Sequence, residues 1–345
     1  MEKDTTTTLD LDDPCTLQRL ERLHDAAAAN VSARLPWMLA WLESHPGWEP
    51  WVLGLSGDDG ELRAVAPLAR RRTGLLLRIL CPGHEGLDYC PTVARTTDDA
   101  VVLAEAVVGR LQALKRPWAL HVRQLPAGSV FGGTLAKHLV AEIKHGADRP
   151  VVLLGGGTDR DDHVSRNQRR AEAKARNRMR DAGLDLRQTW ITDGAAIAER
   201  MPEIRAVHRA RDVQLRGASL IDGREGPFYD ALIRRHLHRM ELLEVRLDNE
   251  LAAYVLWIRN DGTRLVFDNR VAPRWTHYSA GLIANNEALR TAAADPRITC
   301  LDWGAGVQRY KLSSATKVIA HEQLYAWSSQ RLRRVGQLRR RIRPG

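Results

Sequence analysis

The chain has 345 residues, of which 27% are charged and 44% are hydrophobic. This length predicts about two domains, and the composition excludes both a wholly disordered chain and a small disulfide-stapled fold. The sequence has no apolar run of 18 residues, residues 1–14 are polar and acidic, and the four cysteines form no C-x-x-C pair. We therefore expect a cytoplasmic protein without a transmembrane segment, a secretory signal or a metal site.

The positive charge is concentrated in two segments. The chain carries 52 basic and 42 acidic residues, a net charge of +10. Residues 165–180 hold seven basic residues and one acidic residue, and residues 330–345 hold seven arginines and no acid. Such patches attract a pyrophosphate, a nucleic acid or a lipid surface, and charge alone does not choose among these three. A merely solvated basic face is an equally good interpretation.

The first half of the chain predicts three strands, a helix and a further strand. Short apolar runs are separated by turn residues, and the longer segments have helical periodicity. The predicted helices cover 13–29, 36–43 and 98–114, and the predicted strands cover 51–55, 62–69, 75–80 and 118–125.

The same order of elements returns after residue 240. Strands are predicted at 241–247, 251–258 and 265–271, followed by a helix at 281–294 and a strand at 298–302. Between the halves lie strands at 150–154 and 184–191 and helices at 165–180, 195–214 and 227–239. An alternating run at 317–327 precedes the Arg-rich tail. This repetition of element order predicts two related α/β units.

Glycine-rich segments in the chain do not fit nucleotide-binding motifs. The glycines at 155–157 match neither G-x-G-x-x-G nor G-x-x-x-x-G-K-[ST], and no amphipathic helix begins directly after Gly306. A G-x-S-x-G elbow is also absent from the sequence. A nucleotide loop and a serine hydrolase are therefore not predicted.

Short motifs in the second half resemble a known family. They are Ser165-x-Asn167-x-Arg169-Arg170, His208-x-x-Arg211, and Asp302-Trp303-Gly304-Ala305-Gly306 followed by Tyr310-Lys311. Over residues 165–314 this pattern resembles the CelD-type acetyltransferases of the GNAT superfamily, which are relatives of the FemAB peptidoglycan aminoacyltransferases. Val207 and Trp303 stand where the family pattern usually has Leu and Phe.

The resemblance implies an α/β (α+β) fold, a tandem GNAT-like acyl-CoA N-acyltransferase fold with mixed sheets and flanking helices. We expect a degenerate GNAT-like unit at 1–149, an acyltransferase unit at 150–328 and an Arg-rich tail at 329–345. In such a fold the acyl donor lies between two splayed parallel strands, here 265–271 and 298–302. The next helix points its N-terminal amides at the donor pyrophosphate. The turn before that helix has only Gly281 in place of the family's Gly-rich pattern, which argues against the usual coenzyme A pose.

N-acyl transfer requires a neutral amine, a hydrogen-bond donor for the oxyanion and an acid for the leaving group. The resemblance implies catalytic roles for Asp302 as base, Lys311 as a fixed cation and Tyr310 as acid. Asp302 has an alternative role, in which its carboxylate fixes the following loop through backbone N–H groups. The expected donor-binding residues are Phe267, Asp268, Arg270, Tyr278, Gly281, Gly304 and Gly306. The backbone amides beside Phe267 and Asp268 are the expected oxyanion donors, and Tyr278 is a second candidate acid.

The acceptor site is expected to draw on three segments. Asp88 and Tyr89 resemble a pair that faces the acceptor groove in the family. His208 and Arg211 share a helix face and are expected to line one cleft, although a purely structural His208 is the alternative. The remaining expected substrate-binding residues are Asn167, Arg169 and Arg170 of the basic helix.

The resemblance implies an enzyme that transfers an acyl group from acyl-CoA to a small-molecule or peptide amine. An alternative is a FemAB-like aminoacyl or peptidyl transferase that uses aminoacyl-tRNA, because the basic patches suit a nucleic acid. A third interpretation is a catalytically inert scaffold that binds a polyanion. The candidate partners are thus the amine acceptor, a tRNA, and an anionic membrane surface bound through the tail.

Overall fold

The computed structural model describes residues 5–83, 92–155, 161–223 and 225–342, with the backbone alone described from residue 339 onward. The chain forms two compact units. One consists of Met1–Asp148 with Ile319–Gly345, and the other of Arg149–Val318. No helix within the described residues is long and apolar enough to cross a membrane.

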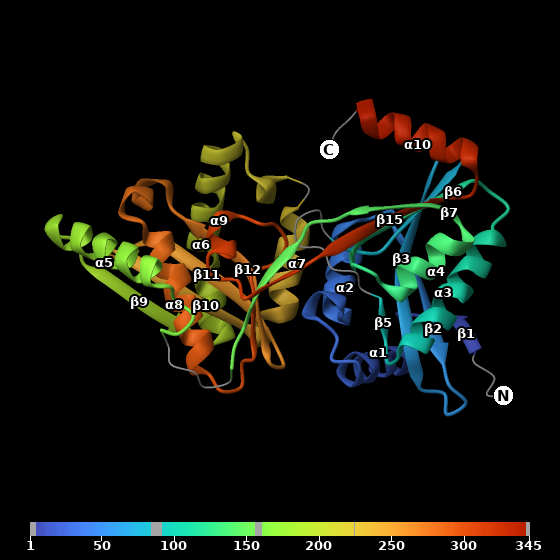
Figure 1. Cartoon of the computed structure of the whole chain (residues 1–345), viewed down its shortest axis with the longest axis horizontal. Helices are drawn as coiled ribbons and strands as arrows, with labels where there is room; N and C mark the ends of the chain where they lie inside the picture. The colour runs from blue at the N-terminus through green and yellow to red at the C-terminus, as the bar shows by residue number, and fades with distance from the viewer. Residues whose placement is uncertain (1–4, 84–91, 156–160, 224, 343–345) are drawn as a thin grey trace. The chain divides into compact units, whose positions relative to one another are not determined.

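The first unit is built on a mixed sheet (Figure 1). Helices α1 (Pro14–Ala26) and α2 (Leu35–Ser44) pack on one face, and α3 (Thr97–Gln112) and α4 (Val130–His138) pack on the other. β4 and β6 are parallel neighbours, joined through α3. In spatial order the strands are β1 (Thr5–Thr8), β2 (Glu49–Ser56), β3 (Leu62–Thr73), β4 (Leu76–Leu80), β6 (Trp118–Pro126), β15 (His321–Trp327) and β7 (Val140–His145), with β5 (Val93–Ala94) paired to β3.

The second unit is built on another mixed sheet. Helices α5 (Arg166–Asp181) and α8 (Ala280–Ala294) share a core with one face, while α6 (Gly194–Arg216) and α7 (Gly226–His236) cover β10 to β12 from the other. β12 and β13 are parallel neighbours, joined through α8. In spatial order the strands are β14 (Lys317–Ile319), β8 (Arg149–Leu153), β13 (Cys300–Asp302), β12 (Thr263–Val271), β11 (Glu250–Asn260), β10 (Met240–Leu247) and β9 (Leu186–Ile191).

The predicted tandem α/β fold is confirmed. The three strands predicted at 51–80 lie in one sheet with the strand predicted at 118–125, and the last two of these four strands pair in parallel. The strands predicted at 265–271 and 298–302 are likewise parallel neighbours. Each unit therefore repeats the strand, helix, strand crossover that places a parallel pair at the centre of its sheet.

The C-terminal boundary of the second unit differs from the prediction of 150–328. The alternating run at 317–327 is two strands, of which β14 lies in the second sheet and β15 lies between β6 and β7 in the first. The Arg-rich tail is a helix, α10 (Gln330–Ile342), that contacts β15 and β7 of the first unit. An alternating pattern shows that a strand has one buried face but not which sheet it joins, so the predicted bounds of the second unit included β15, which pairs in the first sheet.

A buried carboxylate joins α5 to α8. Glu172, on the otherwise basic α5, is 4% exposed, and its carboxylate accepts hydrogen bonds from Arg176, Asn286 and Arg290 at 2.8–3.1 Å. Ser165 and Gln168 begin this helix with the reciprocal hydrogen bonds of a capping box. Glu172 thus adds a buried polar link to the apolar core that α5 and α8 share.

Glu172→Ala should lower the free energy of unfolding by about 3 kcal/mol, because it leaves partly buried arginines without their carboxylate. Denaturant unfolding followed by tryptophan fluorescence measures this change. Asp161→Ala is the matched control, since Asp161 also bonds Arg290 at 2.8 Å but is 53% exposed, and it should cost under about 1 kcal/mol. Equal losses in the two variants would contradict a special role for Glu172.

Candidate active site

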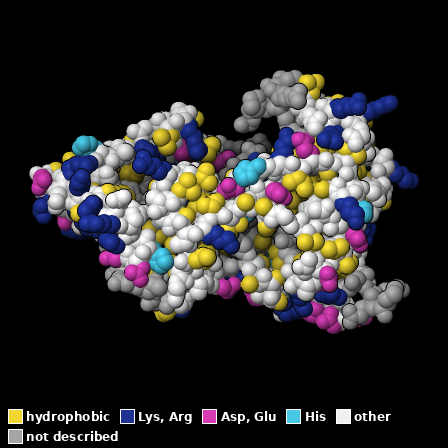
Figure 2. Space-filling view, viewed as in Figure 1, with side chains coloured by type: hydrophobic (Ala, Val, Ile, Leu, Met, Phe, Trp, Pro, Cys, Tyr) yellow, Lys and Arg dark blue, Asp and Glu magenta, His cyan; other side chains and the backbone are white. Residues whose placement is uncertain are grey.

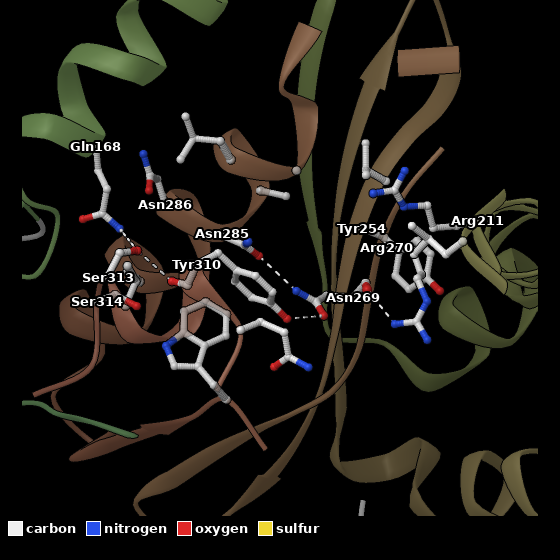
Figure 3. Close-up of a pocket in the computed structure, with 18 of the residues that line it drawn as sticks. Gln168, Arg211, Tyr254, Asn269, Arg270, Asn285, Asn286, Tyr310, Ser313 and Ser314 are labelled. Atoms are coloured by element: carbon white, nitrogen blue, oxygen red, sulfur yellow. Dashed lines mark hydrogen bonds between the residues drawn. The ribbon is translucent and has the colours of Figure 1, made fainter. Parts of the chain in front are cut away.

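A pocket of about 400 Å³ lies where β12 and β13 diverge. Their ladder has three residue pairs and ends at Leu265 and Asp302, after which β13 stops and β12 continues to Val271. Helices from both faces of the sheet border the opening (Figure 3). The lining residues are Gln168, Arg211, Asp212, Leu215, Arg216, Tyr254, Asn269, Arg270, Val271, Gly281, Leu282, Ala284, Asn285, Asn286, Leu289, Trp303, Gln308, Tyr310, Ser313 and Ser314.

The two ends of the pocket differ in charge. Arg211 and Arg270 lie at one end in Figure 3, together with Tyr254. The other end is formed by neutral amide and hydroxyl groups, among them Gln168 of α5 and Ser313. A ligand with an anionic part and a neutral polar part therefore fits the pocket in one direction.

Asp268 anchors a polar cluster beneath the cationic end, in which Arg270 is partly exposed to the pocket and the other members are buried. Its carboxylate accepts hydrogen bonds from Tyr254 at 2.6 Å, Tyr229 at 3.0 Å and His208 at 2.9 Å, and it pairs with Arg270 at 2.8 Å. Burial works to raise the pKa of Asp268, but the Arg270 cation and the hydrogen bonds outweigh it and hold the pKa well below its usual range. Burial and the Asp268 charge raise the pKa of both tyrosines, so they remain hydrogen-bond donors.

His208 lies between two carboxylates. Its Nδ1 bonds Asp268, and its Nε2 is 3.2 Å from both Asp212 Oδ2 and Arg270 Nη2. Since Arg270 only donates and Asp212 only accepts, a neutral ring accepts from Arg270 at Nε2, whereas a protonated ring donates to Asp212. The backbone N–H of Leu220 fixes the same Asp212 oxygen at 3.1 Å. His208 itself does not line the pocket, but Asp212 and Arg270 do.

The loop after β13 is held at both ends. Asp302 is completely buried, accepts a hydrogen bond from the backbone N–H of Gly304 at 2.9 Å and pairs with Arg149 at 3.3 Å. Lys311 is 7% exposed, and its ammonium group donates to the carbonyls of Ala305 at 2.7 Å and Gly304 at 3.5 Å. Burial lowers the pKa of Lys311 to about 8. Neither Asp302 nor Lys311 lines the pocket, so the structure gives Asp302 the loop-fixing hydrogen bond of its alternative role.

Tyr310 is the expected catalytic residue that does line the pocket. Its hydroxyl donates to Asn269 Oδ1 at 3.2 Å, and its ring meets Trp303 edge-on with centroids 5.9 Å apart. Partial burial raises the pKa of this hydroxyl, which keeps it protonated near neutral pH. Tyr310 therefore presents a protonated hydroxyl in the pocket where the two strands diverge.

The expected donor-binding residues are divided between the pocket and its support. Arg270 and Gly281 line the pocket, whereas Phe267 and Asp268 are buried and Tyr278 packs against the core. A Cβ at Gly281 would lie 3.4 Å from Val271 Cβ, an ordinary van der Waals contact, so the packing of α8 on β12 does not itself require a glycine here. Gly304 and Gly306 lie in the loop after β13 with φ of +71° and +95°. Residues other than glycine rarely adopt this backbone conformation.

The N-terminus of α8 opens at this pocket. Ser279 precedes the helix, no side chain caps it, and Gly281 is among the lining residues. The first N–H groups of a helix have no partner within the helix and attract anions. Arg211, 3.5 Å from Thr276 Oγ1 in the preceding turn, adds a cation beside them.

The expected acceptor residues are mostly outside the pocket. Asp88 and Tyr89 lie outside the described residues. Asn167, Arg169 and Arg170 are exposed on α5, where Figure 2 shows a group of Lys and Arg side chains, and Arg169 bonds backbone carbonyls instead. Their neighbour Gln168 faces the pocket, because one position along a helix rotates the side chain by about 100°.

Several pocket residues were missed by the sequence analysis. Asp212 lies one helical turn after His208, so its spacing carried a usable signal. Asn269 and Tyr254 come from strand positions that pattern alone assigns to a buried sheet. Asn285 and Asn286 interrupt the apolar pattern of α8, but nothing in the sequence tells which faces a pocket.

Comparison with known proteins supports an acetyltransferase domain. Residues 166–312 match a family model described as an acetyltransferase (GNAT) domain. The chain is similar to the crystal structure of FemX, with 11% identity, a TM-score of 0.64 and coverage of 96% of this chain and 99% of that one. No curated protein matches it significantly.

Other solved structures share the same fold. A conserved protein of unknown function from Bacteroides thetaiotaomicron VPI-5482 is 13% identical, with a TM-score of 0.56 and coverage of 94% of this chain and 99% of that one. L-PGS from Bacillus licheniformis is 12% identical, with a TM-score of 0.51 and coverage of 91% and 92%. These likenesses extend over both units and show the tandem fold. The family match includes most of the pocket and supports the predicted acyltransferase enzyme.

Asp268→Asn should lower the free energy of unfolding by about 3 kcal/mol at pH 7, because the partly buried Arg270 loses its closest anion and three buried donors lose a charged acceptor. The pKa of Asp268 is depressed in the folded state, so its contribution is present above the unfolded-state pKa of about 3.9 and is lost as the pH falls through the lower folded-state pKa. The free energy of unfolding is measured for both proteins from pH 3 to pH 8. The difference between parent and variant should be constant above about pH 5 and should become smaller only at acidic pH.

Asp222→Asn is the control for this measurement, because Asp222 forms a surface pair with Arg209. It should leave the unfolding midpoint nearly unchanged at every pH. A gap for Asp268→Asn that widens as the pH falls would contradict the electrostatic assignment.

Proposed function

We propose that this protein is an N-acyltransferase of the CelD type that moves an acyl group from acyl-CoA to an amine. The observation that carries the proposal is the pocket at the divergence of β12 and β13, which joins the α8 N-terminus to Tyr310. The GNAT domain match to residues 166–312 and the fold shared with FemX support it.

The donor fits the pocket in one direction. Its pyrophosphate would lie at the N-terminus of α8, where Arg211 supplies a positive charge, without the Gly-rich turn expected from the resemblance. Its acyl-bearing arm would follow β12 past Leu265, where the ladder with β13 has ended. Backbone amides along this stretch would then stabilise the oxyanion.

Tyr310 would protonate the departing thiolate. Its hydroxyl is held by Asn269 and its pKa is raised by burial, so the proton is present until the carbon–sulfur bond breaks. The flanking loop sets its position, because Asp302 and Lys311 hold backbone groups on either side of Ala305. We assign Asp302 and Lys311 as positioning residues.

Asp212 would attract the amine and receive its proton. It is the carboxylate among the pocket-lining residues, and its neighbour His208 can accept a proton at Nε2. Asp268 holds the opposite ring nitrogen, which fixes the ring in place. The amine would thereby lose its proton before it attacks the acyl carbon.

A direct assay tests the proposed donor. The purified protein, freed of RNA, is incubated with acetyl-CoA and a panel of primary amines, and released thiol is measured. Amine-dependent thiol release is expected, and it would exclude an obligatory aminoacyl-tRNA donor. Transfer only from aminoacyl-tRNA would overturn the proposal in favour of the FemAB-like alternative, for which the basic helices α5 and α10 suit a nucleic acid. Absence of transfer from either donor would leave the polyanion-binding scaffold.

Tyr310→Phe should reduce kcat by about 10²-fold, because it removes the proton donor while keeping the ring. Lys311→Ala should reduce kcat through displacement of the same tyrosine. The two losses should therefore be less than additive in the double variant, as measured by steady-state kinetics. Tyr325→Phe, on β15 of the other unit, is the control and should keep the parental kcat. Fully additive losses would show that Lys311 acts independently of Tyr310.

A further inference from the structure

Helix α10 (Gln330–Ile342) presents two neighbouring apolar side chains to solvent. Val335 is 49% exposed and Leu338 is 59% exposed. They are three positions apart, so they lie beside each other on one face of the helix. A single exposed apolar residue is ordinary at a protein surface, whereas adjacent ones form a patch that a partner can cover. This face of α10 is therefore a candidate interaction surface.

Two arginines share this face with the apolar pair. Arg331 lies four residues before Val335, and Arg334 lies four residues before Leu338, so each arginine is next to an apolar side chain. Both arginines are exposed, and neither forms an ion pair within the part of the chain that the structure describes. Residues 330–345 contain seven arginines and no acidic residue, and Figure 2 shows Lys and Arg side chains on α10. The α10 patch, which consists of Arg331, Arg334, Val335 and Leu338, is thus both apolar and cationic.

Another face of α10 packs on the first sheet. A Cβ at Gly336 would lie 2.9 Å from the indole Nε1 of Trp327, so the helix backbone lies directly against this ring. Trp327 belongs to β15 and is 5% exposed. Gln337 donates a hydrogen bond to Glu142 of β7 at 3.2 Å. These contacts fix the rotation of the helix on the sheet and leave the α10 patch facing outward.

The other basic helix exposes a different kind of surface. Arg166, Arg170 and Lys174 recur at every fourth position of α5, and all three are exposed. On α5, which the structure describes throughout, no large apolar side chain is exposed, because Met179 is buried in the core. A purely cationic face suits a phosphate backbone, which gains nothing from aliphatic side chains. The mixed face of α10 suits a lipid surface, where cations meet the headgroups and apolar side chains enter the acyl boundary.

We propose that the α10 patch binds the surface of an anionic phospholipid membrane. The arginines attract the negative surface through water, and burial of the two apolar side chains adds a contribution that salt does not screen. A second copy of this chain is a poorer occupant, because its own α10 patch would bring the same positive charge to the contact. The proposal goes beyond the proposed function, since it concerns the first unit and holds whichever group the second unit transfers.

Vesicle sedimentation of the full chain tests the α10 patch. The protein should sediment with vesicles that contain phosphatidylglycerol and should stay in solution with vesicles of phosphatidylcholine alone. Replacing both apolar residues, Val335→Ser with Leu338→Ser, should weaken binding about tenfold or more and keep its dependence on salt. Replacing both arginines, Arg331→Gln with Arg334→Gln, should weaken binding about 30-fold at low salt and make it less sensitive to salt.

Arg166→Gln with Lys174→Gln is the matched control. It removes two exposed cations from α5, the same change in net charge as the arginine replacement on α10, but these cations have no exposed apolar neighbour. The control should keep the parental vesicle affinity within about twofold, because its charges are not part of the lipid contact. Denaturant unfolding of all three double variants verifies that each remains folded, as expected for substitutions at exposed positions.

Three outcomes would overturn the proposal. Parental affinity after loss of Val335 and Leu338 would show that α10 acts through charge alone. An equal loss in the α5 control would show that binding follows the total charge of the protein and not the α10 patch. Failure of the parent to bind the anionic vesicles would also overturn it, and binding of a single-stranded RNA that is lost with Arg331 and Arg334 would then assign α10 to a nucleic acid. Failure of the acyl-transfer assay would leave this inference intact.

Discussion

The short ladder between β12 and β13 is the constraint on which the second unit depends. Three residue pairs hold the strands together before β13 ends, and β12 continues into the space that opens. Backbone N–H and C=O groups inside a protein require partners, so a strand that leaves its neighbour must be covered by other groups or by a ligand. The loop after β13 and the helices on both faces surround this opening, and the pocket occupies it.

The electrostatic design of the site follows from this opening. Removing Asp268 and Arg270 from water is expensive unless they pair, and they do so in a cluster where tyrosines and a histidine satisfy the remaining acceptor positions. The cluster leaves Arg270 and Asp212 facing the pocket. Glu172 plays the corresponding role for α5 and α8, where it fixes Asn286 at the other end. Two buried carboxylates thus determine the polarity of the pocket at its two ends.

Some residues that the sequence analysis selected line the pocket, whereas others hold the loop that borders it. Tyr310 and Arg270 line the pocket. Asp302 and Lys311 belong to the same motif, but they hold the backbone of the loop and are buried away from the pocket. Adjacent residues on a turn point in different directions, and one-dimensional spacing does not reveal which of them faces a ligand. Which residues of the motif face the pocket is therefore visible only in the structure.

The sequence by itself determined the repeated order of elements in two α/β units and the basic character of α5, because hydrophobic periodicity and charge are read locally. The parallel strands that diverge were expected only from the family resemblance. Only the tertiary structure decided that β15 and α10 belong to the first unit, since strand pairing joins segments about 200 residues apart that share no local signal. It also decided that Tyr254, Asp212 and Asn286 face one pocket. Their meeting depends on the packing of α6, β11 and α8 around β12, and no property of any one segment encodes that packing.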